Sequence, residues 1–144
     1  MSRSHIPDLL RELVRRRAGC VCEYCLLHED DIVHRFHVDH VISEKHGGPT
    51  EDHNLALCCP FCNRAKGSDV GSLEGGEFVR LFNPRIDRWS DHFSLKGDLI
   101  TPLTTVGAVT VRVLCINAAH RLTLRQSLKE ASLFPSEQAL ATMK

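Results

Sequence analysis

Two Cys-x-x-Cys pairs constrain this chain more than any other feature of its sequence. The first pair is Cys22 and Cys25, and the second is Cys59 and Cys62. Four thiolates suit a tetrahedral structural zinc ion, which can stabilise a short segment that buries too little apolar surface to fold alone. We therefore predict that a four-cysteine zinc site joins the two ends of this segment.

The chain has seven cysteines, so three are left over, Cys20, Cys58 and Cys115. Paired Cys-x-x-Cys motifs in a chain without a recognisable secretion signal indicate metal binding more readily than disulfides. Cys20 and Cys58 each lie beside a pair but out of register with it, so we expect small buried residues rather than ligands. A thiol redox role for the first pair lacks the surrounding βαβ pattern.

The segment between the pairs predicts a strand, a loop, a second strand and a helix. Apolar alternation predicts a strand over residues 36–42, and Gly47-Gly48-Pro49 marks a long loop over residues 43–53. Residues 54–57 form the expected returning strand. A short helix is then expected over residues 59–66, with Pro60 in its first turn and Gly67 at its end.

These residues resemble the HNH (His-Asn-His) endonucleases of the ββα-metal class, in the variant with a zinc-binding cysteine pair on either side. The resemblance rests on Val38-Asp39-His40-Val41-Ile42, Gly47-Gly48-Pro49-Thr50, Asn54-Leu55-Ala56-Leu57 and Cys59-Pro60-Phe61-Cys62-Asn63-Arg64-Ala65-Lys66-Gly67. It covers roughly the first half of the chain and implies a ββα-metal, treble-clef-like core that cleaves DNA. Asn63 stands where the family name has its last histidine, and an amide oxygen can replace imidazole as a metal ligand.

Hydrolysis of a phosphodiester needs a base that deprotonates the attacking water. It also needs groups that neutralise the negative charge of the phosphate and stabilise the charge on the leaving oxygen. We expect His40 to be the general base, because neutral imidazole accepts a proton near neutral pH, and the resemblance implies the same role. Asp39 and Asn63 are the expected ligands of a catalytic Mg²⁺ or Mn²⁺ ion, because both offer oxygen. Adjacent strand side chains face opposite ways, so Asp39 and His40 share a site only where the strand ends or twists.

Four further residues are candidates for positioning the catalytic residues or for binding the nucleic acid. The resemblance implies that Asn54 is a structural clasp, whose amide bonds the loop backbone and so fixes His40. Arg64 and Lys66 are expected to contact nucleic-acid phosphates, although a solvated face of an exposed helix explains both nearly as well. His37 is expected to pack in the structure rather than to bind metal.

An N-terminal helix is predicted over residues 4–17, with Pro7 in its first turn and Gly19 at its end. Its expected apolar stripe consists of Ile6, Leu9, Leu10, Leu13 and Val14. Its arginines are Arg11, Arg15, Arg16 and Arg17. They suit phosphate contacts and a solvated helix face about equally.

The C-terminal half predicts a mixed extension. A polar, glycine-rich bridge is followed by expected core contacts from Phe78, Val79, Leu81 and Phe82. Residues 92–100 predict a β-hairpin beside Trp89, and residues 106–116 a helix, with a strand as the alternative. Residues 121–133 are the expected last helix, followed by a frayed end over residues 135–144.

We therefore expect one α+β domain over residues 1–144. Its parts are an HNH nuclease core with the zinc site at residues 18–70 and a C-terminal extension, residues 71–144, packed on that core. The predicted function is a metal-dependent DNA endonuclease. The alternative is a non-catalytic, zinc-stabilised module that binds nucleic acid or protein.

Composition restricts the partners less than the motifs do. The eighteen basic and eighteen acidic residues cancel, so net charge does not identify a nucleic-acid binder. No apolar run approaches the roughly 20 residues that span a bilayer, and residues 1–8 lack the apolar region of a signal peptide. We expect a cytoplasmic protein with no membrane partner, and both a monomer and a homodimer remain open.

Overall fold

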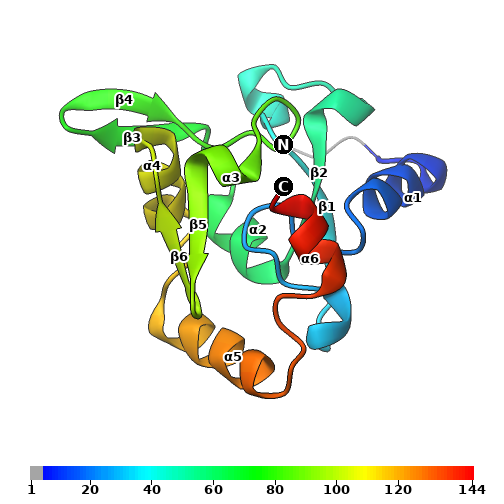
Figure 1. The fold of residues 1–144 in the computed structure, drawn as a ribbon. Coiled ribbons are helices and arrows are strands. Elements are labelled where there is room, and N and C mark those ends of the chain that lie inside the picture. Colours follow the sequence, from blue (N-terminus) through cyan, green and yellow to red (C-terminus); the bar gives the residue numbers. More distant parts are fainter. Residues whose placement is uncertain (1–4) are drawn as a thin grey trace.

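Short hairpins and helices, rather than one continuous sheet, make up residues 5–144, which the computed structural model describes (Figure 1). The strands form three antiparallel pairs: β1 (His37–His40) with β2 (Leu55–Cys58), β3 (Gly71–Glu74) with β4 (Glu77–Arg80), and β5 (Phe93–Lys96) with β6 (Leu99–Pro102). The helices are α1 (Asp8–Arg17), α2 (Pro60–Lys66), α3 (Trp89–His92), α4 (Thr105–Val113), α5 (Ala119–Glu130) and α6 (Glu137–Thr142). Short 3₁₀ turns are η1 (Glu29–Asp31), η2 (Glu44–His46) and η3 (Asp52–Asn54). This mixture confirms the predicted α+β class.

The predicted strand, loop, strand and helix follow one another as β1, η2, η3, β2 and α2. His40, the last residue of β1, pairs with Leu55, the first residue of β2. Pro60 occupies the first turn of α2, and Gly67 ends the helix with φ 52°, a conformation that favours glycine. Local sequence signals therefore fix both ends of the helix that carries the second cysteine pair.

Helix α1 begins at Asp8, so the predicted start is too early, and its first residue, Ser4, lies outside the described residues. Ile6 and Val14 are buried, as expected, but Leu9 is 88% exposed and Leu13 is 47% exposed. The apolar stripe is therefore narrower than predicted, because α1 packs on the β1–β2 hairpin and η3 along one side and Leu9 and Leu13 face away from them.

A hairpin at residues 71–80 was not predicted. Gly75 and Gly76 form its turn with φ 59° and 83°, and β3 pairs with β4 on either side. Leu81 and Phe82 are buried as predicted, but Phe78 is 64% exposed. Strand β3 is half-buried against α4 but carries the polar residues Ser72 and Glu74, so it lacks the clear apolar alternation that identifies a strand.

The predicted second hairpin and helix are confirmed as β5–β6 and α4. The Thr104 side chain caps α4 by accepting a hydrogen bond from the Gly107 amide at 3.0 Å, which favours a helix over the alternative strand. Phe93 and Val109 are buried, and the Phe93 ring lies 5.2 Å from the Trp89 ring. This core lies outside the segment between the cysteine pairs.

Helix α5 is not the last helix, and the chain does not fray after residue 135. Ser136 caps α6 through the Ala139 amide at 3.0 Å, and Ala139 is fully buried. The Gln138 side chain packs close to Gly19, at the turn that follows α1. Helix α6 thus packs beside the turn that follows α1. No helix among residues 5–144 has the length and apolar content of a membrane span.

Candidate active site and metal centre

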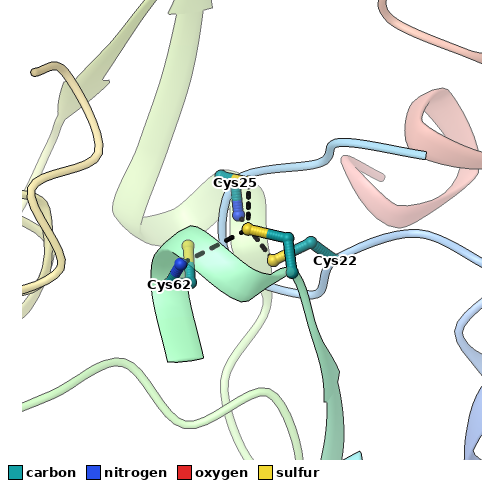
Figure 2. Close-up of side chains that lie close together, drawn as sticks. Cys22, Cys25 and Cys62 are labelled. Atoms are coloured by element: carbon teal, nitrogen blue, oxygen red, sulfur yellow. Dashed lines mark hydrogen bonds between the residues drawn. The ribbon is translucent and has the colours of Figure 1, made fainter. Parts of the chain in front are cut away.

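Four buried sulfurs, from Cys22, Cys25, Cys59 and Cys62, lie within 4.8 Å of one another. The sulfurs of Cys25 and Cys59 are 3.6 Å apart. Four ligands at the usual zinc–sulfur distance of about 2.3 Å place neighbouring sulfurs about 3.8 Å apart in a tetrahedron. Figure 2 shows the sulfurs of Cys22, Cys25 and Cys62 converging on a common point. The cluster therefore fits a structural zinc ion, as the spacing predicted.

The backbone of each cysteine pair orients its sulfurs. The Cys25 amide donates to Cys22 Sγ at 3.5 Å, and the Cys62 amide donates to Cys59 Sγ at 3.4 Å. Such amide donors stabilise thiolates in a buried site. Cys58 is buried but outside the metal-binding group, as expected, and burial raises the pKa of its thiol.

Arg121 on α5 contacts the cysteine cluster, and the sequence patterns did not predict this contact. Its Nη2 donates to Cys62 Sγ at 3.0 Å and its Nη1 to the Leu114 carbonyl at 2.7 Å, while the guanidinium lies over the Phe61 ring. Burial lowers the pKa of Arg121, but the neighbouring thiolates raise it more, so the net shift is upward. A permanent positive charge therefore offsets the negative charge of the thiolates.

Asp39 and Lys66 meet at the end of β1. Lys66 Nζ lies 3.5 Å from Asp39 Oδ2 and donates to the His40 carbonyl at 2.9 Å. Lys66 is only 1% exposed and Asp39 is 5% exposed, so the expectation of an exposed Lys66 is wrong. The strand ends at His40, and the lysine satisfies a carbonyl there that would otherwise lose its partner. Its ammonium group faces the candidate site.

Asn63 lies on the same face of α2, one helical step before Lys66. Its Oδ1 atom is buried and accepts no hydrogen bond from the described part of the chain. A buried amide oxygen without a donor is uncommon, and a cation is one of the few groups that satisfies it. Asn63 Oδ1 and the Asp39 carboxylate, which also lies 3.5 Å from Lys66 Nζ, are oxygen donors of the kind that a divalent ion prefers.

The His40 ring is held by two residues that the sequence did not single out. Its Nε2 lies 2.8 Å from Thr50 Oγ1 and 3.5 Å from Glu44 Oε1. Thr50 donates its hydroxyl proton to Glu44 at 3.0 Å, so the Thr50 oxygen accepts from His40. The ring proton therefore sits on Nε2, and no hydrogen bond from residues 5–144 reaches Nδ1. Glu44 lies four residues after His40, but the two residues are not in one helix. The turn of the chain from β1 into η2 brings their side chains together.

Asn54 ties the loop to the end of β1. Its Oδ1 accepts from the Ile42 amide at 3.0 Å, and its Nδ2 donates to the carbonyls of Ile42 and Pro49, both at 2.9 Å. A side chain at Gly48 would place its Cβ 1.8 Å from the Ile42 carbonyl oxygen and 2.7 Å from Asn54 Nδ2. The glycine in this loop is thus required by the close approach of the loop to the end of the strand.

Arg64 and His37 lie away from this cluster. Arg64 is exposed, on the face of α2 opposite to Asn63 and Lys66. His37 begins β1 and is exposed, so the expectation that it packs in the interior is wrong. Lys66 contacts the Asp39 carboxylate and the His40 backbone carbonyl, the His40 ring contacts Thr50 and Glu44, and Asn63 lies on α2 three residues before Lys66.

A comparison with known families agrees with this geometry. No curated protein and no solved structure matches the chain. The family model of the HNH endonuclease matches residues 22–69, which include both cysteine pairs and the residues around His40. The similarity to the HNH endonuclease family thus covers residues 22–69, one third of the chain.

Proposed function

We propose that this chain is a metal-dependent endonuclease that hydrolyses phosphodiester bonds of DNA. The observation that carries the proposal is the position of His40. Its ring is held through Nε2, and its Nδ1 receives no hydrogen bond from the described chain. It lies next to Asp39, at the strand end that faces α2 and the unpartnered oxygen of Asn63. A zinc-stabilised binding module needs no such base.

In the proposed reaction His40 Nδ1 accepts a proton from the attacking water. The Nε2 proton stays on its bond to Thr50, and Glu44 accepts from Thr50 and lies 3.5 Å from Nε2. The carboxylate therefore stabilises the imidazolium that forms, and Thr50 keeps the ring in one tautomer. Glu44 and Thr50 are positioning residues in this scheme. Asn54 keeps the backbone around them in place.

Asp39 and Asn63 would hold the catalytic divalent ion, since carboxylate and amide oxygens suit Mg²⁺ or Mn²⁺. When bound, such an ion neutralises the charge that develops on the departing 3′ oxygen. Lys66 anchors the His40 carbonyl and lies beside the Asp39 carboxylate. It therefore keeps the strand end, and both functional side chains on it, at a fixed distance from α2.

Plasmid cleavage tests this function. Purified wild type is expected to nick or linearise a supercoiled plasmid with Mg²⁺ or Mn²⁺, and to leave it intact without an added divalent ion. His40→Ala is expected to lower the rate by about 10²- to 10⁴-fold, the usual contribution of a general base. His53→Ala is the matched control, because this histidine lies in the same domain but its side chain is 66% exposed.

The zinc content and the thermal unfolding of each variant are measured alongside the rate. Cleavage by His40→Ala at the wild-type rate would remove His40 from its role. A wild type that binds DNA and leaves it intact with every divalent ion would instead identify the alternative, a zinc-stabilised binding module.

A further inference from the structure

A second feature of α2 is a groove on its outer face, which we call the α2 groove. It encloses about 670 Å³ between residues 34–37, the outer face of α2 and the segment from Leu114 to Arg121. Its polar and aromatic lining includes His34, Arg35, His37, Phe61, Arg64 and His120. One wall lies outside residues 22–69, so the domain that matches the HNH family does not form this groove alone.

The charge of the α2 groove has one sign. Its lining contains arginines and histidines and no carboxylate. Arg35 and Arg64 are both exposed, and neither guanidinium makes a hydrogen bond or an ion pair with another residue in the described part of the chain. Arg121 at the floor already faces the thiolates. Two unpaired guanidinium groups thus face the same solvent-filled space, which favours an anionic ligand.

The arginines of α1 provide a contrast. Arg15 is paired with Glu29, and Arg17 donates to the backbone carbonyls of Asp52 and Leu55. Arg16 lies 3.3 Å from Glu12. The groove beside α1, which His34 and Arg35 also line, contains Asp8, Glu12, Glu29 and Asp30. Arg15 and Arg16 of α1 thus have carboxylate partners, whereas Arg35 and Arg64 in the α2 groove have none in the described part of the chain.

The α2 groove and the candidate active site share two elements. On α2, Phe61, Arg64 and Ala65 line the groove, whereas Asn63 and Lys66 face the site. On β1, His37 lines the groove and His40 is the candidate base. Three residues of strand span about 10 Å. The end of the groove at His37 therefore lies about 10 Å along the strand from His40.

We propose that the α2 groove binds the phosphodiester backbone of the DNA strand on one side of the cleaved bond. The proposal rests on the proposed endonuclease function and specifies the surface along which the DNA strand lies. Arg35 and Arg64 contact phosphates, since guanidinium groups bind phosphate oxygens in a bidentate manner. The Phe61 and His120 rings, 5.7 Å apart, provide flat apolar surface for sugars or an unstacked base.

The test measures binding separately from cleavage. A fluorescein-labelled duplex of about two helical turns is titrated with the His40→Ala protein without an added divalent ion, and anisotropy is followed at several salt concentrations. In that background, Arg35→Gln with Arg64→Gln is expected to weaken binding at least tenfold at low salt. The slope of log K against log [salt] is expected to fall by about 1.8, because each lost phosphate contact removes about 0.9.

The matched control removes the same charge from α1, as Arg15→Gln with Arg16→Gln, and is expected to keep the wild-type slope. An unchanged slope in the groove variant, with a reduced slope in the α1 variant, would overturn the proposal. So would equal competition by poly-glutamate of the same charge, which would identify an acidic polypeptide as the ligand. If the wild type fails to cleave plasmid but the groove variant still loses DNA binding, the nuclease function is rejected. The α2 groove is then retained as a DNA-binding site.

Discussion

Residues 22–69 and the C-terminal segment that follows them are stabilised in different ways. In the first, strands of four residues and a helix of seven residues surround four buried sulfurs. In the second, β5, β6 and α4 bury a continuous apolar group that includes Phe93, Ile100 and Val109. The buried apolar residues of both regions belong to one core, to which Tyr24, Leu26 and Leu57 contribute from the first region. Metal ligation is therefore an additional source of stabilisation in the first region, and the second relies on removal of apolar surface from water.

The first region also buries polar residues, since Asp39 is 5% exposed and His40 is 4% exposed. Polar groups at buried positions add no apolar burial, and zinc adds stabilisation there through ligands that are far apart in the chain. Arg121 then joins the two regions, because it lies on α5 and donates to Cys62 Sγ. Substitutions in each region, and at the link between them, separate the two kinds of stabilisation.

The largest effect is expected from removing a zinc ligand. Cys59→Ser should abolish zinc binding and unfold residues 22–69, because structural zinc contributes about 10–16 kcal/mol in small zinc domains and the whole stability of a typical domain is about 5–15 kcal/mol. Metal analysis and far-ultraviolet circular dichroism measure the two consequences. Cys58→Ala is the control, since Cys58 is buried beside the cluster but lies outside it. A Cys59→Ser protein that retains zinc and melts with the wild type would contradict the assigned ligands.

A smaller effect is expected from a cavity in the C-terminal core. Phe93 is 1% exposed and its ring lies 5.2 Å from that of Phe82, so Phe93→Ala should cost about 3–5 kcal/mol in urea unfolding. Zinc content at low denaturant should stay at the wild-type level. Phe78→Ala makes the same change at a side chain that is 64% exposed, and its cost should stay within about 0.5 kcal/mol. Loss of zinc from folded Phe93→Ala protein would show that the C-terminal core is needed to stabilise the zinc site.

The smallest effect is expected at the link between the regions. Arg121→Met keeps much of the length of the side chain and removes its charge, so zinc affinity should fall about 10- to 100-fold, the usual effect of losing a group that bonds a metal ligand. Competition with a chromophoric chelator measures this affinity. Arg125→Met is the control, because Arg125 is equally buried but bonds Asp98, Ile116 and Asn117 rather than sulfur. Equal zinc affinity of the two variants would remove Arg121 from the metal centre.

Sequence patterns were sufficient where the cause of a structure is local. Proline at the start of α2 and glycine at its end set the helix boundaries, and the two cysteine pairs each form a tight turn through their own backbone. The β5–β6 hairpin and the Thr104 cap of α4 follow in the same way. These features depend on residues within one or two turns of each other, so their signals survive in a single sequence.

Patterns were insufficient where a residue has its partner far along the chain. Lys66 looked like an exposed helix residue, but its ammonium reaches β1. The last helix, α6, was expected to fray because nothing local shows that Ala139 is buried or that the helix packs against the turn after α1. The β3–β4 hairpin has a clear glycine turn but strands without apolar alternation. Each error concerns burial, which a sequence reports only indirectly.

The sequence by itself determined the ligand chemistry of this protein: four thiolates for zinc, an imidazole beside a carboxylate, and two asparagines in a fixed order. The tertiary structure alone decided how these groups are supported. It brings Thr50 and Glu44 into contact with the His40 ring, Lys66 with the His40 carbonyl and Arg121 with Cys62 Sγ. It also brings Arg35 and Arg64 together in the α2 groove. The reason is physical: side-chain chemistry belongs to a residue, whereas the field and the contacts around it arise only when distant segments pack together.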